Sequence, residues 1–294
     1  MDTSKQLYEI DATGWKRGLY DDIKRTFRAP IVNWIFRTTI ANYPEFLRYA
    51  WGQVKPAFQT ARFGHLSVSY RDTVLSAVSD ETPIPTYRCD ELEITPAEYG
   101  ELRGQLATYD IVAPRLAVLF ELVDRALSDE PIGTAPDRTR DATAPLPAEF
   151  DAERGRPPTM VAFDETPAEL VDVVPAIQSF HGLEDGLPSI YRTLAQWPGY
   201  LVPMWDDLEP ILRSDGFSTA VVDARTAVTE YVDSLPYTPQ LGPESLERNG
   251  IDEPAIEELQ TLFREFNQGA IETVVPALPV YATTVAAAGS RSLE

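Results

Sequence analysis

The chain has 294 residues, of which 44% are hydrophobic, enough to bury a substantial core. Its formal net charge of −21, from 46 acidic and 25 basic side chains, argues against nucleic acid as a partner. No stretch approaches the roughly 20 apolar residues of a membrane-spanning helix, so the sequence also predicts no membrane partner.

Helical spacing dominates the first half of the chain. After Pro44 the apolar side chains recur at three- and four-residue intervals on one helix face, and residues 66–78 repeat this pattern. The sequence Thr-Pro-Ala-Glu at 95–98 has the form of a capping box with proline at the first helical position. It predicts a helix that ends near residue 110, followed by a separate apolar helix over 111–127.

An acidic, proline-rich segment over 129–167 predicts an extended crossover between two halves. In the second half, residues 218–235 show the helical pattern again, and Asp252 is placed to cap a helix that ends near residue 267. A last apolar helix is expected from residue 270 to about 285. The tail at 286–294 ends in Gly-Ser-Arg-Ser-Leu-Glu, which resembles a cloning scar and is left out of the fold.

The most informative feature is a duplication. An Arg-Thr motif, an aromatic-Pro motif and a tryptophan follow one another over 35–51 and again, with the same spacing after the proline, over 190–205. The tryptophans that close the two copies continue an apolar stripe and are expected in the core. We therefore predict an all-α protein of two tandem helical repeats, over 1–128 and 168–285, that form an internal pseudo-dimer with a site at their seam.

Acidic side chains are spread along the chain, and its only four lysines all precede residue 56. Such a surface stays hydrated where salt screens charges, which predicts a halophilic, cytoplasmic protein; the polar start is unlike a signal peptide. An acidic tail or a calcium-binding surface is the alternative, but no EF-hand pattern is present. The single cysteine, Cys89, excludes an intramolecular disulfide and fits a reducing compartment.

Several of these motifs resemble the group I 2-haloacid dehalogenases of the DehI type. The runs that carry the resemblance are Tyr20-Asp21-Asp22-Ile23, Arg28-Ala29-Pro30, Tyr43-Pro44 through Trp51, and Leu194-Ala195-Gln196-Trp197-Pro198. The resemblance covers most of 8–285 outside the crossover. It implies an all-helical pseudo-dimer that removes halide from carbon 2 of a short 2-halocarboxylic acid by direct attack of water, without a cofactor or a metal. The expected partner is a small carboxylate or apolar ligand, and the expected state is a monomer or a homodimer.

The resemblance also assigns site residues. The family's reaction needs an aspartate as general base, and this chain has Ile190 at that position, directly after Ser189. Where the family has an asparagine and a tyrosine in its first half, this chain has Ala113 and Leu116, and Ile31 stands in the place of a tryptophan. The resemblance thus implies an apolar site, in which an isoleucine cannot abstract a proton.

Other polar residues are candidates for a role. Asp185, in the loop before the second motif, and Asp110, interpreted as a solvated acid at a helix end, are candidates for a displaced base. His181, before Gly182 in the loop leading to the seam, could serve as a base, but it is expected to be a solvated loop histidine. A chain with two histidines cannot build a multi-histidine metal centre. Arg37 and Arg192 occupy equivalent places in the repeats and fit either a ligand carboxylate or a structural tie between helix ends.

Two functions stay open on the sequence alone. One is hydrolysis of a 2-halocarboxylic acid with a displaced base. The other is a catalytically inactive homologue that binds a small apolar or carboxylate ligand at the seam. Because the replacements remove polar groups that would be costly to bury unpaired, they favour binding over hydrolysis.

Overall fold

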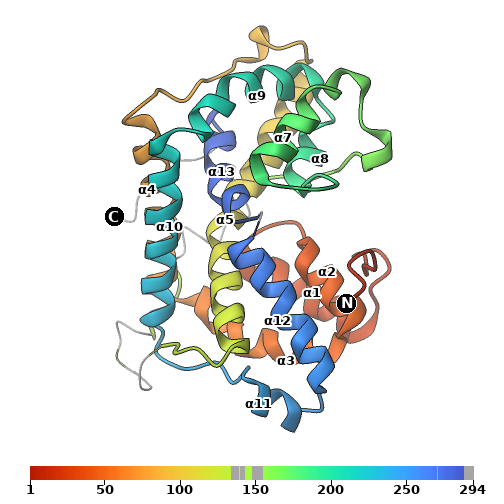
Figure 1. Ribbon diagram of the computed structural model, residues 1–294, viewed down its shortest axis with the longest axis vertical. Helices are drawn as coiled ribbons and strands as arrows, with labels where there is room; N and C mark the ends of the chain where they lie inside the picture. Colours follow the sequence, from red (N-terminus) through yellow and green to blue (C-terminus); the bar gives the residue numbers. More distant parts are fainter. Residues whose placement is uncertain (134–138, 140–142, 148–154, 270, 288–294) are drawn as a thin grey trace. The chain divides into compact units, whose positions relative to one another are not determined.

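The structure is a computed structural model, and it describes residues 1–133, 139, 143–147, 155–269 and 271–287 (Figure 1). Within these ranges every element is a helix, and one isolated bridge pairs Thr60 with Pro145. The prediction of an all-α fold is confirmed. Over the same ranges, no helix is both long enough and apolar enough to cross a membrane.

The described α-helices range from six residues in α8 to 32 in α5. They are α1 (Gly14–Phe27), α2 (Trp34–Asn42), α3 (Pro44–Val54), α4 (Ala61–Ser79), α5 (Pro96–Leu127), α7 (Val173–His181), α8 (Ser189–Leu194), α9 (Pro198–Leu212), α10 (Asp215–Asp233), α11 (Pro243–Arg248), α12 (Glu253–Gln268) and α13 (Ile271–Thr283). Short 3₁₀ turns occur at η1 (Lys55–Gln59), η2 (Cys89–Glu91), η4 (Phe163–Glu165) and η5 (Ala168–Leu170).

The chain divides into two compact units. Unit 1 comprises Met1–Ser67, Arg115–Glu153 and Ala227–Gly269, and unit 2 comprises Val68–Pro114, Arg154–Thr226 and Ala270–Glu294. Each unit contains segments from both predicted repeats, so the boundaries of the units differ from those of the repeats. The division into repeats remains a prediction.

One helix differs from the expectation. The sequence predicts one helix ending near residue 110 and a second over 111–127, whereas α5 runs without a break from Pro96 to Leu127. Pro114 lies inside it and removes one backbone hydrogen bond. The side chains beside this proline, Ala113 and Arg115, are both buried, which shows that packing outweighs the local cost.

In unit 1, the helices α1, α2 and α3 lie together (Figure 1). Their shared core is aromatic: the Phe27 ring packs 5.5 Å from Phe36 and 6.0 Å from Trp51, and the rings of Phe36 and Trp51 are 5.8 Å apart. Trp51 Nε1 donates a hydrogen bond to Asp22 Oδ2 over 2.8 Å. The expectation that Trp51 is a core residue is confirmed, since only 4% of it is exposed.

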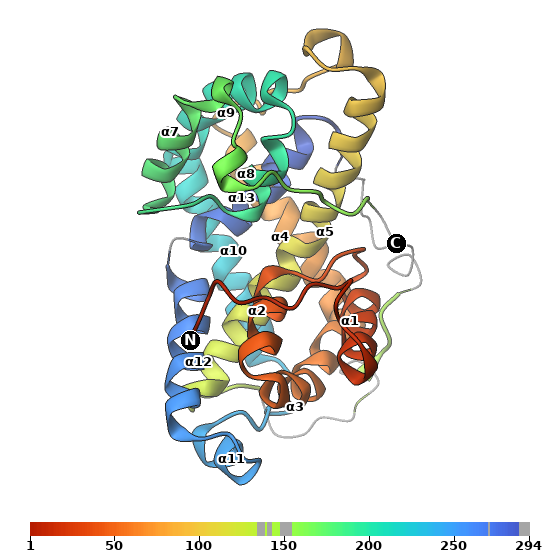
Figure 2. The same ribbon diagram turned by 90° about the vertical axis from the view of Figure 1, so that its right-hand side faces the viewer.

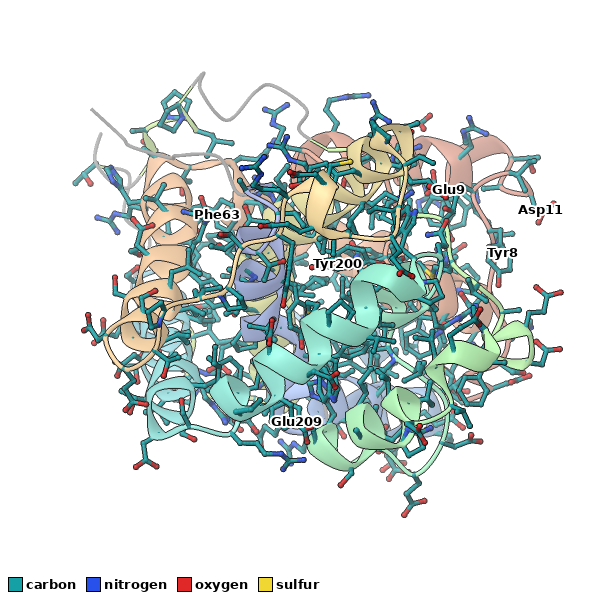
Figure 3. All side chains as sticks on the ribbon, turned by 90° about the horizontal axis from the view of Figure 1, so that it is seen from above. Tyr8, Glu9, Asp11, Phe63, Tyr200 and Glu209 are labelled. Atoms are coloured by element: carbon teal, nitrogen blue, oxygen red, sulfur yellow. The ribbon has the colours of Figure 1, made fainter. Side chains whose placement is uncertain are left out.

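Unit 2 builds a similar core from α7, α8, α9 and α13, which Figure 2 shows grouped together. Trp205 is 1% exposed and lies 5.8 Å from the rings of both Phe180 and Tyr191. Figure 3 shows how α9 divides its faces: Tyr200 points into the packed side chains, and Glu209 on the same helix points away from them. The stripe of apolar residues in the sequence therefore marks the buried face of this helix.

Candidate functional site

The site residues implied by the resemblance fall in both units. Ser189 and Ile190 begin α8 in unit 2, and Ala113 lies inside α5 in the same unit. Ile190 is 2% exposed and Ala113 is fully buried, while Ser189 is half-buried. Ile31 and Leu116 belong to unit 1, and both are half-buried. Of these five residues only Ser189 carries a polar side chain, and none can act as a base near neutral pH.

In unit 1, aromatic residues lie close in the sequence to Ile31 and Leu116. The Trp34 ring, three residues after Ile31, stacks on Phe266 at 5.2 Å, and Phe266 contacts Phe120 at 5.1 Å. Phe120 lies one helical turn after Leu116, on the same face of α5. This part of unit 1 is thus a half-buried apolar and aromatic surface.

The two candidate carboxylates have different environments. Asp185 is exposed in the loop before α8, and its Oδ1 accepts a hydrogen bond from the Gly186 N–H over 2.7 Å. Asp110 is 1% exposed, and its Oδ1 lies 3.5 Å from Arg71 Nε of α4. The prediction that Asp110 is a solvated acid at a helix end was therefore wrong. Because α5 continues past it, Asp110 faces the packed interior and needs a cation as its partner.

His181 is also buried, so the prediction of a solvated loop histidine was wrong. It is the last residue of α7, which ends at Gly182 in the left-handed conformation with φ of 66°. Its Nδ1 lies 2.7 Å from Thr273 Oγ1, and its Nε2 lies 2.5 Å from the Tyr191 hydroxyl. Burial lowers the pKa of His181 to about 4, so the imidazole is neutral at neutral pH.

The hydrogen-bonded chain continues beyond the histidine. The hydroxyls of Tyr191 and Tyr281 are 2.5 Å apart, and neither side chain is exposed. Burial, together with the neighbouring Tyr281, raises the pKa of Tyr191 well above its usual value. Sequence reasoning missed this chain, because its members come from three helices and no spacing in the sequence relates them.

Arg37 and Arg192, the two arginines at equivalent places in the predicted repeats, each bind an extended segment to a helix through hydrogen bonds. Arg37 donates from Nε to Gln6 Oε1 over 3.1 Å and lies over the Tyr8 ring, and Arg192 donates from Nε to the Val161 carbonyl over 3.0 Å. Figure 3 shows Tyr8 with Glu9 and Asp11 along the N-terminal segment of unit 1.

The backbone repeats the same arrangement. The Leu7 N–H donates to the Arg37 carbonyl over 3.1 Å, and the Val161 N–H donates to the Arg192 carbonyl over 3.0 Å. Since both guanidinium groups are engaged in these ties, the contacts favour the structural role over anion binding.

The comparisons with known proteins point to one family. Residues 30–165 match the family model described as "Halocarboxylic acid dehydrogenase DehI". A (R)-2-haloacid dehalogenase of Pseudomonas putida is 25% identical over 244 residues, which make up 82% of this chain and 79% of that protein. A configuration-inverting 2-haloacid dehalogenase of Alcaligenes xylosoxydans xylosoxydans is 24% identical over 237 residues, or 79% of this chain and 77% of that protein.

Solved structures show the same fold. A D-2-haloacid dehalogenase in complex with L-LA matches with a TM-score of 0.82 and 20% identity over 95% of each chain. A mutant of a D-2-haloacid dehalogenase with D-2-CPA matches with a TM-score of 0.81 and 20% identity, over 95% of this chain and 94% of that one. In sequence this chain is therefore similar to 2-haloacid dehalogenases over most of its length, and it shares the all-α fold of the D-2-haloacid dehalogenases.

Proposed function

We propose that this chain is a DehI-type homologue that binds a small carboxylate or apolar ligand and does not hydrolyse a carbon–halogen bond. The observation that carries the proposal is Ile190, which is 2% exposed and stands, by resemblance, where the family's general base is expected. Direct attack of water on carbon 2 requires a group that accepts the proton of that water, and an isoleucine offers none.

We infer that the candidate titratable groups do not replace the missing base. Asp110 is buried against Arg71, and Asp185 is exposed in a loop. Both ring nitrogens of His181 lie within hydrogen-bonding distance of a hydroxyl group. Each of the three groups therefore has a structural role that explains its presence.

The apolar character of the implied site supports a ligand with apolar surface. In unit 2, Ala113 and Ile190 are both buried and apolar. Burying apolar ligand surface against such side chains contributes about 25 cal/mol per Å². One matching structure is a complex of a D-2-haloacid dehalogenase with L-LA, which supports a small-molecule site on this fold.

Hydrolysis with a displaced base is the second candidate. It is favoured by one observation: Asp110 lies three residues before Ala113, so the two side chains point to neighbouring parts of the same face of α5. If Asp110 were the base, Asp110→Asn would abolish halide release while the protein stayed folded.

The charge of the chain supports a proposal about where the protein works. The excess of acids over basic residues, with four lysines in all, fits a surface that works in a salt-rich cytoplasm. The protein would act there as a monomer or a homodimer.

Thermal unfolding with 2-chloropropionate tests the proposed binding. A ligand present at a hundred times its Kd stabilises the folded state by about 2.7 kcal/mol, so the native chain should show a Tm that rises with ligand concentration. Halide release from either enantiomer should stay at the level of the buffer control. A Tm indifferent to 2-chloropropionate and to longer 2-alkyl acids would contradict the binding proposal, and turnover by the native chain would favour the displaced base.

A further inference from the structure

We infer that Tyr191, Arg192 and Thr193 are positioning residues that hold α8, and with it Ser189 and Ile190, in a fixed place within unit 2. The helix α8 has only six residues, Ser189–Leu194, and a helix of this length is not stable by itself in water. Its position must therefore come from contacts with other elements.

The three consecutive residues after Ile190 each bind a different element. The Tyr191 hydroxyl lies 2.5 Å from His181 Nε2 of α7 and 2.5 Å from the Tyr281 hydroxyl of α13. Arg192 exchanges two hydrogen bonds of 3.0 Å with Val161 of the preceding extended segment. Thr193 Oγ1 lies 2.8 Å from the Tyr109 hydroxyl of α5. Tyr191, His181, Tyr281 and Thr193 are all buried, so water cannot replace these partners.

Unit 1 shows that the fold does not require these polar groups. Phe27 ends α1 as His181 ends α7, and the predicted repeat pairs Phe36 with Tyr191. The Phe27 and Phe36 rings are 5.5 Å apart, against 5.4 Å for the His181 and Tyr191 rings. The next ring contact has the same length in both units, since Trp51 lies 5.8 Å from Phe36 and Trp205 lies 5.8 Å from Tyr191. The same packing is therefore available to apolar side chains.

The hydroxyl that corresponds to Thr193 gives a second contrast. Thr38 of α2 is fully buried, and its Oγ1 has no hydrogen-bond partner among the described residues. In unit 1, α2 is anchored by apolar contacts, by Arg37 and by Asn42, which donates to the Asp2 carbonyl. In unit 2, α8 is anchored by hydrogen bonds of buried side chains to α5, α7 and α13. Directional bonds fix the orientation of a helix more closely than apolar contacts do, and fixed orientation is what a binding residue at its start requires.

This inference rests on the proposed function only for the role of Ser189 and Ile190 in ligand binding. The anchoring itself is testable without a ligand, by hydrogen exchange of the native full-length chain and of Tyr191→Phe. Removing this hydroxyl takes away its contacts with His181 and Tyr281, so it should speed the exchange of the α8 amides by at least about tenfold. Tyr200→Phe is the matched control, because it removes an equally buried hydroxyl, bonded to Thr284, from α9.

The double variant His181→Phe/Tyr191→Phe copies the Phe27 and Phe36 pair. It tests the same loss of hydrogen bonds in case Tyr191→Phe alone does not fold. It should keep the Tm of the native chain within a few degrees and show the faster exchange at α8. The inference is overturned if exchange at α8 is unchanged in both variants, or if Tyr200→Phe speeds it equally.

A second readout separates positioning from stability. If 2-chloropropionate raises the Tm of the native chain, the double variant should need about tenfold more ligand for the same rise, whereas Tyr200→Phe should not. Equal ligand dependence in all three proteins would contradict the positioning role. Absence of binding to the native chain would contradict the proposed function, and hydrogen exchange would still decide the anchoring of α8.

Discussion

The ion pair between Asp110 and Arg71 has a measurable consequence for stability. Asp110 is 1% exposed, and the Arg71 side chain is 12% exposed. Removing one partner of a buried pair leaves an uncompensated charge, at a cost of about 3–5 kcal/mol. Because Arg71 also lies 3.5 Å from Asp72, we expect Asp110→Ala to lower the free energy of unfolding by about 3 kcal/mol, the lower end of this range.

Urea unfolding of the native chain and of Asp110→Ala measures this difference. Asp185→Ala is the control, because it removes an exposed loop carboxylate and should change the free energy of unfolding by less than about 0.5 kcal/mol. The double variant Arg71→Met/Asp110→Leu should recover most of the loss, since apolar side chains of similar volume replace a buried pair at little cost. An Asp110→Ala variant as stable as the native chain would refute a stabilising role for the ion pair. Catalysis would then be the better explanation for a carboxylate at this buried position.

Three further predictions concern the surface and the two tryptophans. Trp51→Phe should cost about 1–2 kcal/mol more than Trp205→Phe in urea unfolding, because only Trp51 donates to a carboxylate, while the buried Trp205 Nε1 has no hydrogen bond among the described residues; equal costs would contradict this. Burial opposes ionisation of Asp22, but hydrogen bonds from Lys55 and Trp51 outweigh it and lower its pKa. The contribution of Asp22 to the free energy of unfolding is therefore present above the pKa of about 4 that this group has in the unfolded chain, and it is lost as the pH falls through the lower pKa of the folded state. The free energy of unfolding of Asp22→Asn should therefore fall less steeply with acid than that of the native chain. If the acidic surface is adapted to salt, the Tm should rise steeply as KCl reaches the molar range, and a Tm indifferent to salt would defeat that interpretation.

Local chemistry in the sequence predicted the helix starts at Pro44, Pro96 and Glu253. The capping box at Thr95 forms as expected: the Thr95 N–H donates to Glu98 Oε2 over 2.7 Å, and the Glu98 N–H donates to Thr95 Oγ1 over 3.3 Å. Asp252 caps α12 by accepting from the Ala255 N–H over 3.1 Å. These partners lie within three residues of each other, so residue type and spacing alone determine them.

Features that depend on distant partners were not predictable in this way. Whether Asp110 ends a helix or lies inside one depends on packing around Pro114, and the Arg71 that pairs with it is on another helix. His181 is buried because Thr273 and Tyr191, from α13 and α8, satisfy its two nitrogens. The apolar character of the candidate site, by contrast, was readable from Ile190 and its neighbours, because it follows from residue identity.

Halide release by the native chain and by Ile190→Asp tests the central claim most directly. Both enantiomers of 2-bromopropionate should be offered in bromide-free salt, with Ile190→Asn as the control that adds a polar side chain of the same shape without a base. We expect no turnover by the native chain or by Ile190→Asn, and bromide release by Ile190→Asp. Turnover by the native chain at a rate that Ile190→Asp does not raise would contradict the central claim, because the base would then lie elsewhere.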